Sequence, residues 1–297
     1  MIFRGTAPAL VTPFTLDGKI DEPAFRLLID DQIRGGVEAL VVLGTTGENP
    51  TISHDERRRL VDLSIEHTAG RVPVIIGSGT NNTNESIVFS KEAAAAGADG
   101  LLVVGPYYNK PTPAGYVSHF QAVAEATDLP IIVYNVPGRT ASNITSETML
   151  ELAEIPTIVG VKEASGNIGQ ISDIIAHRPD GFAVYAGDDE IAFPLIALGA
   201  DGVISVISNA CPKYFSHMIR LALSGAYTEA RANHLALLTA MRACFYESNP
   251  VPVKAVLAHL GKMSNTVRLP LVTLTAANHR RVLDAMLPFV EEAKVEL

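Results

Sequence analysis

The sequence predicts a (β/α)8 barrel, also called a TIM barrel, followed by an all-helical C-terminal extension. Three observations support this: eight short apolar runs recur at fairly even spacing, helical patterns separate them, and Gly-Ala-Asp-Gly occurs twice between a helical pattern and the next run. Eight such units in roughly 220 residues suit this barrel, whose usual size is about 250 residues. We therefore expect a catalytic barrel domain over residues 1–225 and a helical domain over residues 226–297.

The expected strands consist mostly of consecutive β-branched and other apolar residues. Because apolar and polar residues do not alternate, the pattern indicates strands buried on both faces, as in a parallel sheet. The runs span residues 6–10, 39–43, 74–76, 100–104, 131–134, 158–161, 183–185 and 202–206.

The segments between the runs have helical periodicity. Examples are residues 22–35, 53–68, 84–96 and 146–153. Ser53 and Glu56 have the spacing of a capping box, and Ser146 stands where an N-cap is expected. The pair Gly35 and Gly36, and Gly97, are expected to end helices, because glycine adopts positive φ without steric cost. From about residue 212 the pattern predicts helices only.

Composition excludes several classes of protein. The 297 residues include 23 Lys and Arg against 32 Asp and Glu, a net charge of −9, so the field of the protein repels nucleic acids and anionic membranes. The longest apolar runs are far shorter than the roughly 20 residues of a transmembrane helix. The chain begins without the pattern of an export signal, and its two cysteines give no disulfide framework. A cytoplasmic protein is therefore expected.

The polar residues that follow the apolar runs are the candidates for chemistry, because barrel active sites lie at the C-terminal ends of strands. Lys162 is the only one of eight lysines at the end of an expected strand. Such a lysine either faces solvent or is buried, and a buried amine with a lowered pKa can form a Schiff base with a carbonyl.

Three further features adjoin Lys162 in this scheme. Tyr134 is either a core tyrosine or one whose hydroxyl reaches the mouth of the barrel. Arg139 is either a surface arginine or a partner for a carboxylate. Residues 44–47, with Thr45 and Thr46 between two glycines, form either a simple turn or a cradle of N–H groups for a carboxylate. The eight histidines show no metal-ligand spacing, so no metal is expected.

Together these motifs resemble the dihydrodipicolinate synthase family, over essentially the whole chain. The matching segments are GTTGE at 44–48, PYYNKP at 106–111, YNVPGR at 134–139, GVKEASGN at 160–167, GDD at 187–189 and NPVPVK at 249–254. GTTGE and the strand-end lysine are shared with a wider superfamily of pyruvate-dependent class I aldolases. YNVPGR and PYYNKP are more specific to the synthases.

The resemblance implies that pyruvate condenses with L-aspartate 4-semialdehyde to give 4-hydroxy-tetrahydrodipicolinate, the committed step of lysine and diaminopimelate biosynthesis. Lys162 would form the Schiff base with pyruvate, and the turn with Thr45 and Thr46 would hold its carboxylate. Tyr134 would relay protons, connected through Thr45 to Tyr108.

In this family Tyr108 would reach into the site of a neighbouring subunit, within a homotetramer made of two tight dimers. Arg139 would bind the semialdehyde carboxylate, and main-chain groups of Gly187 and Ile204 would shape the pocket. No separate cofactor is implied, because the covalent adduct on Lys162 serves as the electron sink.

The resemblance also implies a regulatory site for L-lysine. His54, Asn81, Glu85 and Tyr107 match the pattern of inhibited relatives, although Asn81 and Glu85 also suit an ordinary turn and the first turn of a helix. Two positions depart from that pattern. Arg57 replaces a histidine, and Asn49 with the following proline replaces smaller residues. An arginine beside a cationic ligand costs Coulomb energy unless its side chain swings into water, so weak and partial inhibition is expected.

Two alternatives remain open at this point. The first is a related class I aldolase, such as N-acetylneuraminate lyase or a keto-sugar-acid aldolase, and Arg139 argues against it because those enzymes accept sugar chains. The second is a sensor that binds pyruvate-like acids without turnover. Lys162, Tyr134 and Thr45 together argue against a sensor.

Overall fold

The computed structural model describes residues 1–290, in which eight parallel strands form one sheet that nearly closes into a barrel. The strands are β1 (Gly5–Pro8), β2 (Leu40–Val42), β3 (Val74–Gly77), β4 (Gly100–Val104), β5 (Ile131–Asn135), β6 (Ile158–Glu163), β7 (Ala183–Ala186) and β8 (Gly202–Ser205). From β2 to β8 each strand pairs with the next one in sequence, and β1 pairs with β8. A bridge between Ala9 and Val41 joins the two remaining edges.

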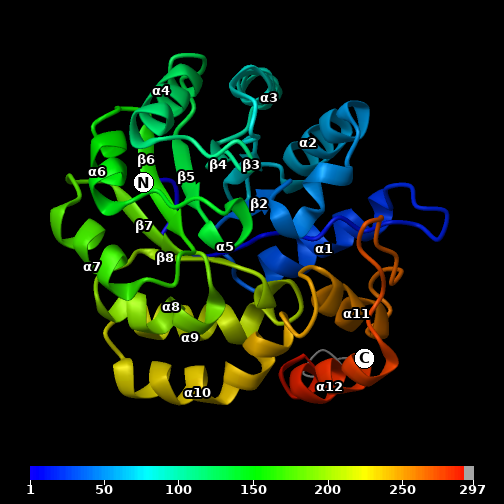
Figure 1. The fold of residues 1–297 in the computed structure, drawn as a ribbon. Coiled ribbons are helices and arrows are strands. Elements are labelled where there is room, and N and C mark those ends of the chain that lie inside the picture. Colours follow the sequence, from blue (N-terminus) through cyan, green and yellow to red (C-terminus); the bar gives the residue numbers. More distant parts are fainter. Residues whose placement is uncertain (291–297) are drawn as a thin grey trace.

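Helices surround the strands in a ring (Figure 1). They are α1 (Glu22–Arg34), α2 (His54–Thr68), α3 (Thr83–Ala96), α4 (Pro113–Ala124), α5 (Pro137–Thr140), α6 (Ser146–Ala153), α7 (Ile168–His177), α8 (Asp189–Ala197), α9 (Pro212–Leu223), α10 (Tyr227–Ala243), α11 (Val251–His259) and α12 (Ala276–Met286). Short 3-10 turns are η1 (Thr45–Gly47), η2 (Asn49–Thr51), η3 (Ile207–Asn209) and η4 (Leu287–Phe289). The predicted fold class, a barrel with a C-terminal helical region, is confirmed.

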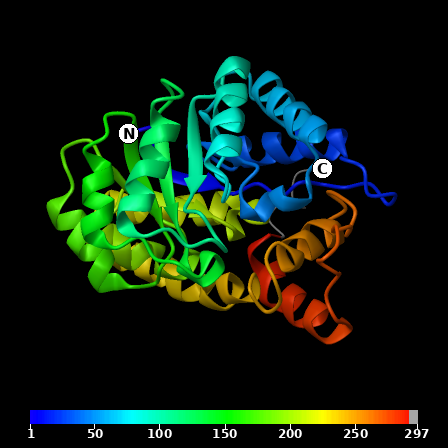
Figure 2. The same ribbon diagram turned by 45° about the horizontal axis from the view of Figure 1, so that its top comes forward.

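The last helices lie beside the barrel, as the orange and red ribbons show in two views (Figures 1 and 2). The expected domain boundary after residue 225 lies between α9 and α10. One continuous apolar core includes both barrel residues such as Phe25 and extension residues such as Leu257. The division at 225 remains a prediction, and part of the expected helical domain, residues 291–297, lies outside the described residues.

A second, smaller apolar core fills the inside of the barrel. Its floor is formed by Phe3, just before β1, which stacks on Tyr185 of β7 with ring centres 4.3 Å apart. The Tyr185 hydroxyl donates to the Phe3 carbonyl at 2.7 Å. The N-terminal end of the barrel is therefore closed by the beginning of the chain.

The helix ends agree with the sequence in part. The capping box of Ser53 and Glu56 is present at α2. One expectation is wrong by one residue, because Thr145, not Ser146, caps α6. Gly35 and Gly36 end α1 as expected, with Gly35 as the C-cap and positive φ at Gly36. Within residues 1–290, none of the helices has both the length and the apolar character needed to span a membrane.

Candidate active site

The candidate site is built on two neighbouring strands. In the register of β5 and β6, Tyr134 lies directly beside Lys162. The Lys162 amine lies 4.3 Å from the centre of the Tyr134 ring, and both side chains are buried. The parallel register thus places two expected catalytic groups side by side at the C-terminal end of the barrel.

The environment of Lys162 favours the neutral amine. The pKa of Lys162 is lowered from 10.5 to about 8, chiefly by burial; the charge of Asp189 opposes this shift, and the positive charge of Arg139 adds to it. Within residues 1–290, no carboxylate forms an ion pair with this amine. A buried amine without an anionic partner is a potential nucleophile near neutral pH.

Gly187, at the end of β7, leaves room for the lysine. A Cβ atom added at this position would lie 2.7 Å from the Cβ of Ala164 and 3.2 Å from the Cε of Lys162. Any larger residue would therefore clash with Ala164 and crowd the Lys162 side chain. This is a steric reason for the glycine in addition to the predicted role of its main chain.

The turn after β2 brings two threonines to the same place. Thr45 and Thr46 lie in η1, and a hydrogen bond connects Thr45 with the Tyr134 hydroxyl. Thr46 is buried, and its Oγ1 accepts a hydrogen bond from Nδ2 of Asn249 at 2.9 Å. Burial raises the pKa of Tyr134, while the charge of Arg139 and the Thr45 contact lower it, so the phenol is protonated at neutral pH.

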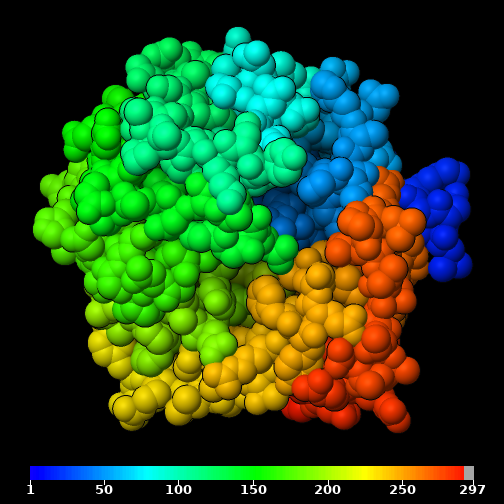
Figure 3. Space-filling model, viewed as in Figure 1, coloured from blue at the N-terminus to red at the C-terminus, as the bar shows by residue number. Residues whose placement is uncertain are grey.

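These residues line a hollow at the barrel mouth. A cavity of about 330 Å³ contains Lys162, Gly187 and Asn249 in its wall, and an adjoining cavity of about 240 Å³ extends it past Tyr107. Thr45, Tyr134, Val136 and Arg139 belong to both walls. The space-filling view is hollowed near the middle of its face, between the barrel and the orange C-terminal segment (Figure 3). Arg139 itself is exposed, so its guanidinium is available at the rim.

Two expected site residues do not line this hollow. Ile204 of β8 is fully buried in the inner core. Tyr108 has left-handed backbone, with φ of 68°, and 89% of its side chain is exposed. In the single chain Tyr108 therefore stands away from Lys162.

Sequence reasoning gave no role to two residues: Asn249, which lines the hollow, and Asp189, whose charge acts on Lys162. Asp189, the first residue of α8, is buried, and its Oδ2 accepts the N–H groups of Val206 and Ile207 at 3.0 and 2.8 Å. Burial raises its pKa to about 6. Asn249 belongs to a segment far along the chain. Both lie in motifs that carry the family resemblance, but only the fold shows what they face.

A separate hollow contains most of the residues expected to bind lysine. It has a volume of about 560 Å³, and Asn49, His54, Glu85 and Tyr107 line it. Asn81 is not part of the wall, but its main chain forms a hydrogen bond with Tyr107. Among the described residues, no lysine lines this hollow. The imidazole of His54 is already engaged, because its Nε2 contacts the Glu92 carboxylate at 2.9 Å. Asn49 and Tyr107 also line the cavity that adjoins the Lys162 site.

Arg57 lies in the wall of this hollow and is held there. Its guanidinium lies 4.0 Å from the centre of the Phe89 ring and donates to Asn49 Oδ1 at 2.8 Å and to the Gly77 carbonyl. The side chain is buried, and burial lowers its pKa to about 10. The idea that this side chain swings into water is therefore wrong for this structure, because three contacts fix it.

No group of three or more His, Cys, Asp or Glu side chains suited to a metal ion is found in residues 1–290. Chemistry at the mouth of the barrel can instead use the amine of Lys162, the phenol of Tyr134, two threonine hydroxyls and the cation of Arg139. This set suits covalent capture of a small keto acid.

Comparisons with known proteins give the chain its relatives. A protein of Salinibacter ruber (strain DSM 13855 / M31), named 4-hydroxy-tetrahydrodipicolinate synthase, is 61% identical over 96% of this chain and 95% of its own length. The dihydrodipicolinate synthase structure from Thermotoga maritima superposes with a TM-score of 0.95 at 42% identity, covering 97% of this chain and 99% of that one. The Cyanidioschyzon merolae structure, described with lysine bound, has a TM-score of 0.94 at 40% identity, covering 96% and 98%.

The model of the dihydrodipicolinate synthetase family matches residues 2–287, which is nearly the whole chain. The resemblance seen in the motifs is thereby confirmed. With a barrel of the same shape and relatives of this identity, the chain belongs to the dihydrodipicolinate synthetase family.

Proposed function

We propose that the chain condenses pyruvate with L-aspartate 4-semialdehyde to give 4-hydroxy-tetrahydrodipicolinate in lysine and diaminopimelate biosynthesis. The family and the name of its relatives bear out the expected enzyme class, a lyase of the class I aldolase type. The observation that carries the proposal is the amine of Lys162, buried beside Tyr134 with its pKa lowered to about 8.

The first step is attack of the neutral Lys162 amine on the keto carbon of pyruvate. At about pH 7, about a tenth of an amine with a pKa of about 8 is neutral, whereas less than about a thousandth of an ordinary lysine is neutral at that pH. Loss of water from the carbinolamine gives the protonated imine. Hydroxyl and N–H groups of the turn with Thr45 and Thr46 bind the pyruvate carboxylate.

The second step uses the imine as an electron sink. A proton leaves the pyruvate methyl group, and the resulting enamine carbon attacks the aldehyde carbon of the second substrate. Tyr134, a protonated phenol beside the imine nitrogen, moves protons in these steps. The substrate's own amine then attacks the imine carbon, which closes the ring and releases Lys162, so the net reaction loses one water.

Arg139 is proposed to bind the distal carboxylate of the semialdehyde, because its exposed guanidinium stands at the rim of the hollow. Asp188 lines the hollow together with Lys162, and among the described residues in its wall Arg139 supplies the guanidinium. Arg139→Ala should raise KM for the semialdehyde at least tenfold, about 1.4 kcal/mol of lost binding, with a smaller change for pyruvate. Equal changes for both substrates would contradict this role.

The direct test is reduction with borohydride in the presence of pyruvate. The peptide that carries Lys162 should gain the mass of one reduced pyruvyl group. An adduct on another lysine, or none, would refute the mechanism. A coupled assay with both substrates, with pyruvate and sugar aldehydes in parallel, then separates the proposed reaction from that of a sugar-acid aldolase.

We further propose that the active protein needs no separate cofactor, acts in the cytoplasm and is a homotetramer of two tight dimers. Support for the assembly comes from Tyr108, an exposed phenol for which the single chain offers no use. If Tyr108 completes a partner's site, inactive Tyr108→Phe mixed with inactive Lys162→Ala should regain activity when subunits exchange. Sedimentation of the wild-type protein measures the assembly itself.

The hollow lined by Glu85 and Tyr107 is proposed as a weak site for L-lysine. Glu85 is exposed there and can pair with an ammonium group, whereas the fixed cation of Arg57 in the same wall opposes a cationic ligand. Titration with L-lysine should give partial inhibition in the wild type and weaker inhibition in Glu85→Ala. Full insensitivity of the wild type, or the same inhibition in the variant, would exclude this site.

A further inference from the structure

The C-terminal extension contacts the turn that carries Thr45 and Thr46. Asn249, two residues before α11, donates from Nδ2 to Oγ1 of Thr46 at 2.9 Å, and both side chains are buried. The two residues lie 203 positions apart in the sequence. Asn249 also forms part of the wall of the hollow that contains Lys162.

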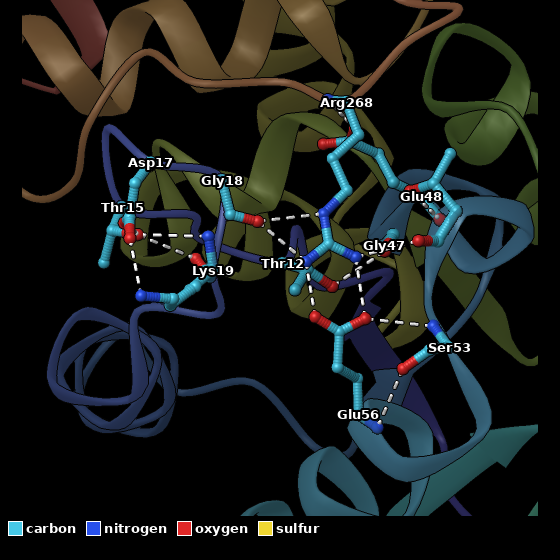
Figure 4. A network of polar contacts seen from close by, with 11 residues as sticks. Thr12, Thr15, Asp17, Gly18, Lys19, Gly47, Glu48, Ser53, Glu56 and Arg268 are labelled. Carbon is cyan, nitrogen blue, oxygen red and sulfur yellow. Dashed lines mark hydrogen bonds and ion pairs between the residues drawn. The ribbon is translucent and has the colours of Figure 1, made fainter.

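A second contact holds the other end of the same turn. Glu48, with left-handed backbone between η1 and η2, forms an ion pair with Lys254 of α11 at 2.6 Å. The other carboxylate oxygen of Glu48 accepts the main-chain N–H of Arg268 at 3.0 Å. Figure 4 shows the Arg268 side chain between Glu56 and the Gly18 carbonyl, close to Glu48. The extension thus holds the turn at Thr46 and at Glu48.

The direction of the first hydrogen bond matters for binding. Because Thr46 Oγ1 accepts from Asn249, the hydroxyl proton of Thr46 remains available for an acceptor in the hollow, whose wall includes Thr46. A carboxylate offers only acceptors, so a hydroxyl oriented in this way complements it.

Asn249 is also not explained by packing alone. Its Oδ1 is buried and has no hydrogen-bond partner among the described residues. Burying an unsatisfied amide oxygen is unfavourable, and an apolar side chain of similar size would avoid that penalty. The amide is therefore present for its donor, which is used on Thr46.

We propose that Asn249 is a positioning residue, which orients the Thr46 hydroxyl toward the carboxylate of the keto acid. The ion pair of Glu48 and Lys254 keeps the turn in place for this contact. The inference rests on the proposed function, because it assigns to Thr46 the carboxylate of pyruvate. The extension thereby belongs to the substrate-binding apparatus.

The experiment measures pyruvate binding separately from turnover. The readout is the pyruvate concentration that gives half-maximal borohydride trapping on Lys162, together with KM for each substrate. Asn249→Ala should raise that concentration about tenfold, the effect of one lost hydrogen bond to a charged group, while KM for the semialdehyde changes less. Asn278→Ala is the matched control, because it removes an asparagine hydrogen bond, to Glu247 at 2.8 Å, elsewhere in the extension.

Two further variants distinguish positioning from packing. Asn249→Asp preserves the shape of the side chain but adds a negative charge near the pyruvate carboxylate, so it should bind pyruvate more weakly than Asn249→Ala. In a Thr46→Val background, Asn249→Ala should have no additional effect, because the hydroxyl that it orients is gone. If Asn249→Ala folds poorly, Asn249→Asp, which keeps the size of the side chain, is compared with the wild type instead.

The outcomes distinguish failure of the proposed function from failure of the positioning role of Asn249. Absence of any pyruvate adduct in the wild type would overturn the proposed function. If the wild type forms the normal adduct, three results would each overturn the positioning role alone. They are pyruvate trapping by Asn249→Ala as good as that of the wild type, a weaker effect of Asn249→Asp than of Asn249→Ala, and additive effects of Asn249→Ala and Thr46→Val.

Discussion

Two buried lysines in this molecule have opposite surroundings. Lys162, at the mouth of the barrel, is 5% exposed and has no ion pair in the described part of the chain. Lys254, where α11 meets the barrel, is 0% exposed, contacts Glu48 at 2.6 Å and donates to the Thr12 carbonyl at 3.0 Å. Burial lowers the pKa of both, but the charge of Glu48 and its hydrogen bond oppose the shift in Lys254.

The difference shows that burial alone does not make a lysine reactive. An amine that donates to a carboxylate and a carbonyl has its protons committed and remains an ammonium ion in a structural contact. Both amines lie over an aromatic ring and have an arginine nearby that favours the neutral form, but Lys162 forms no ion pair with the described residues, so it loses its proton more easily. The partner therefore decides which of two equally buried lysines becomes a nucleophile.

The largest expected effect is on turnover and concerns Lys162 alone. Lys162→Met should lower kcat by more than about a thousandfold, because the covalent intermediate cannot form. The thermal midpoint should stay close to that of the wild type, since the substitution replaces a buried charge with an apolar chain of similar length. Steady-state assays and circular dichroism measure both. Considerable residual turnover would place the nucleophile elsewhere.

Lys254→Met tests the other half of the comparison. It leaves the Glu48 carboxylate buried without its cation, so the free energy of unfolding should fall by about 3–5 kcal/mol in urea titrations. Lys254→Met combined with Glu48→Gln should recover part of that loss, because the uncompensated charge is removed. A wild-type stability in Lys254→Met would mean that the pair is not structural.

The pH dependence of the free energy of unfolding should reveal the lowered pKa of Lys162. Its pKa is about 8 in the folded chain and 10.5 in the unfolded chain. Between these values the unfolded chain binds more protons, so this group makes the free energy of unfolding rise with pH, by up to about 3 kcal/mol. Below about pH 8 its contribution is constant. The difference between wild type and Lys162→Met isolates this group, and a flat difference over the window would contradict the lowered pKa.

The smallest expected effect is on the free energy of unfolding and concerns an exposed ion pair between α8 and α10. Arg242 of α10 contacts Glu190 of α8, but 55% of the arginine side chain is exposed. Solvent screens such pairs, so Arg242→Met should cost less than about 1 kcal/mol of unfolding free energy. A loss as large as that of Lys254→Met would show that exposure does not distinguish these two ion pairs.

The sequence predicted the elements that depend on local pattern. All eight strands were located because uninterrupted apolar runs mark strands of a buried parallel sheet, and Ser53 with Glu56 identified a helix start. An error of one residue arose where two similar residues adjoin, at Thr145 and Ser146, since both carry a hydroxyl that can cap a helix.

The candidate site was predictable only in part. Lys162, Tyr134 and the turn with Thr45 could be found because each follows an apolar run, and strand ends meet at one face of a barrel. The contacts of Asn249 with Thr46 and of Lys254 with Glu48 span more than 200 residues and follow no periodicity. Similarly, the fixed position of Arg57 depends on Phe89 and Gly77, which lie on other elements.

The closed floor under the inner core has a consequence for the order of events. Because Phe3 and Tyr185 seal the barrel below Lys162, both substrates must enter, and the product must leave, through the same opening. In the proposed reaction the keto acid reacts at Lys162, inside the hollow, and the semialdehyde binds to Arg139 at the rim. We therefore expect pyruvate to enter first and the semialdehyde second, and the ring product to leave before the next cycle.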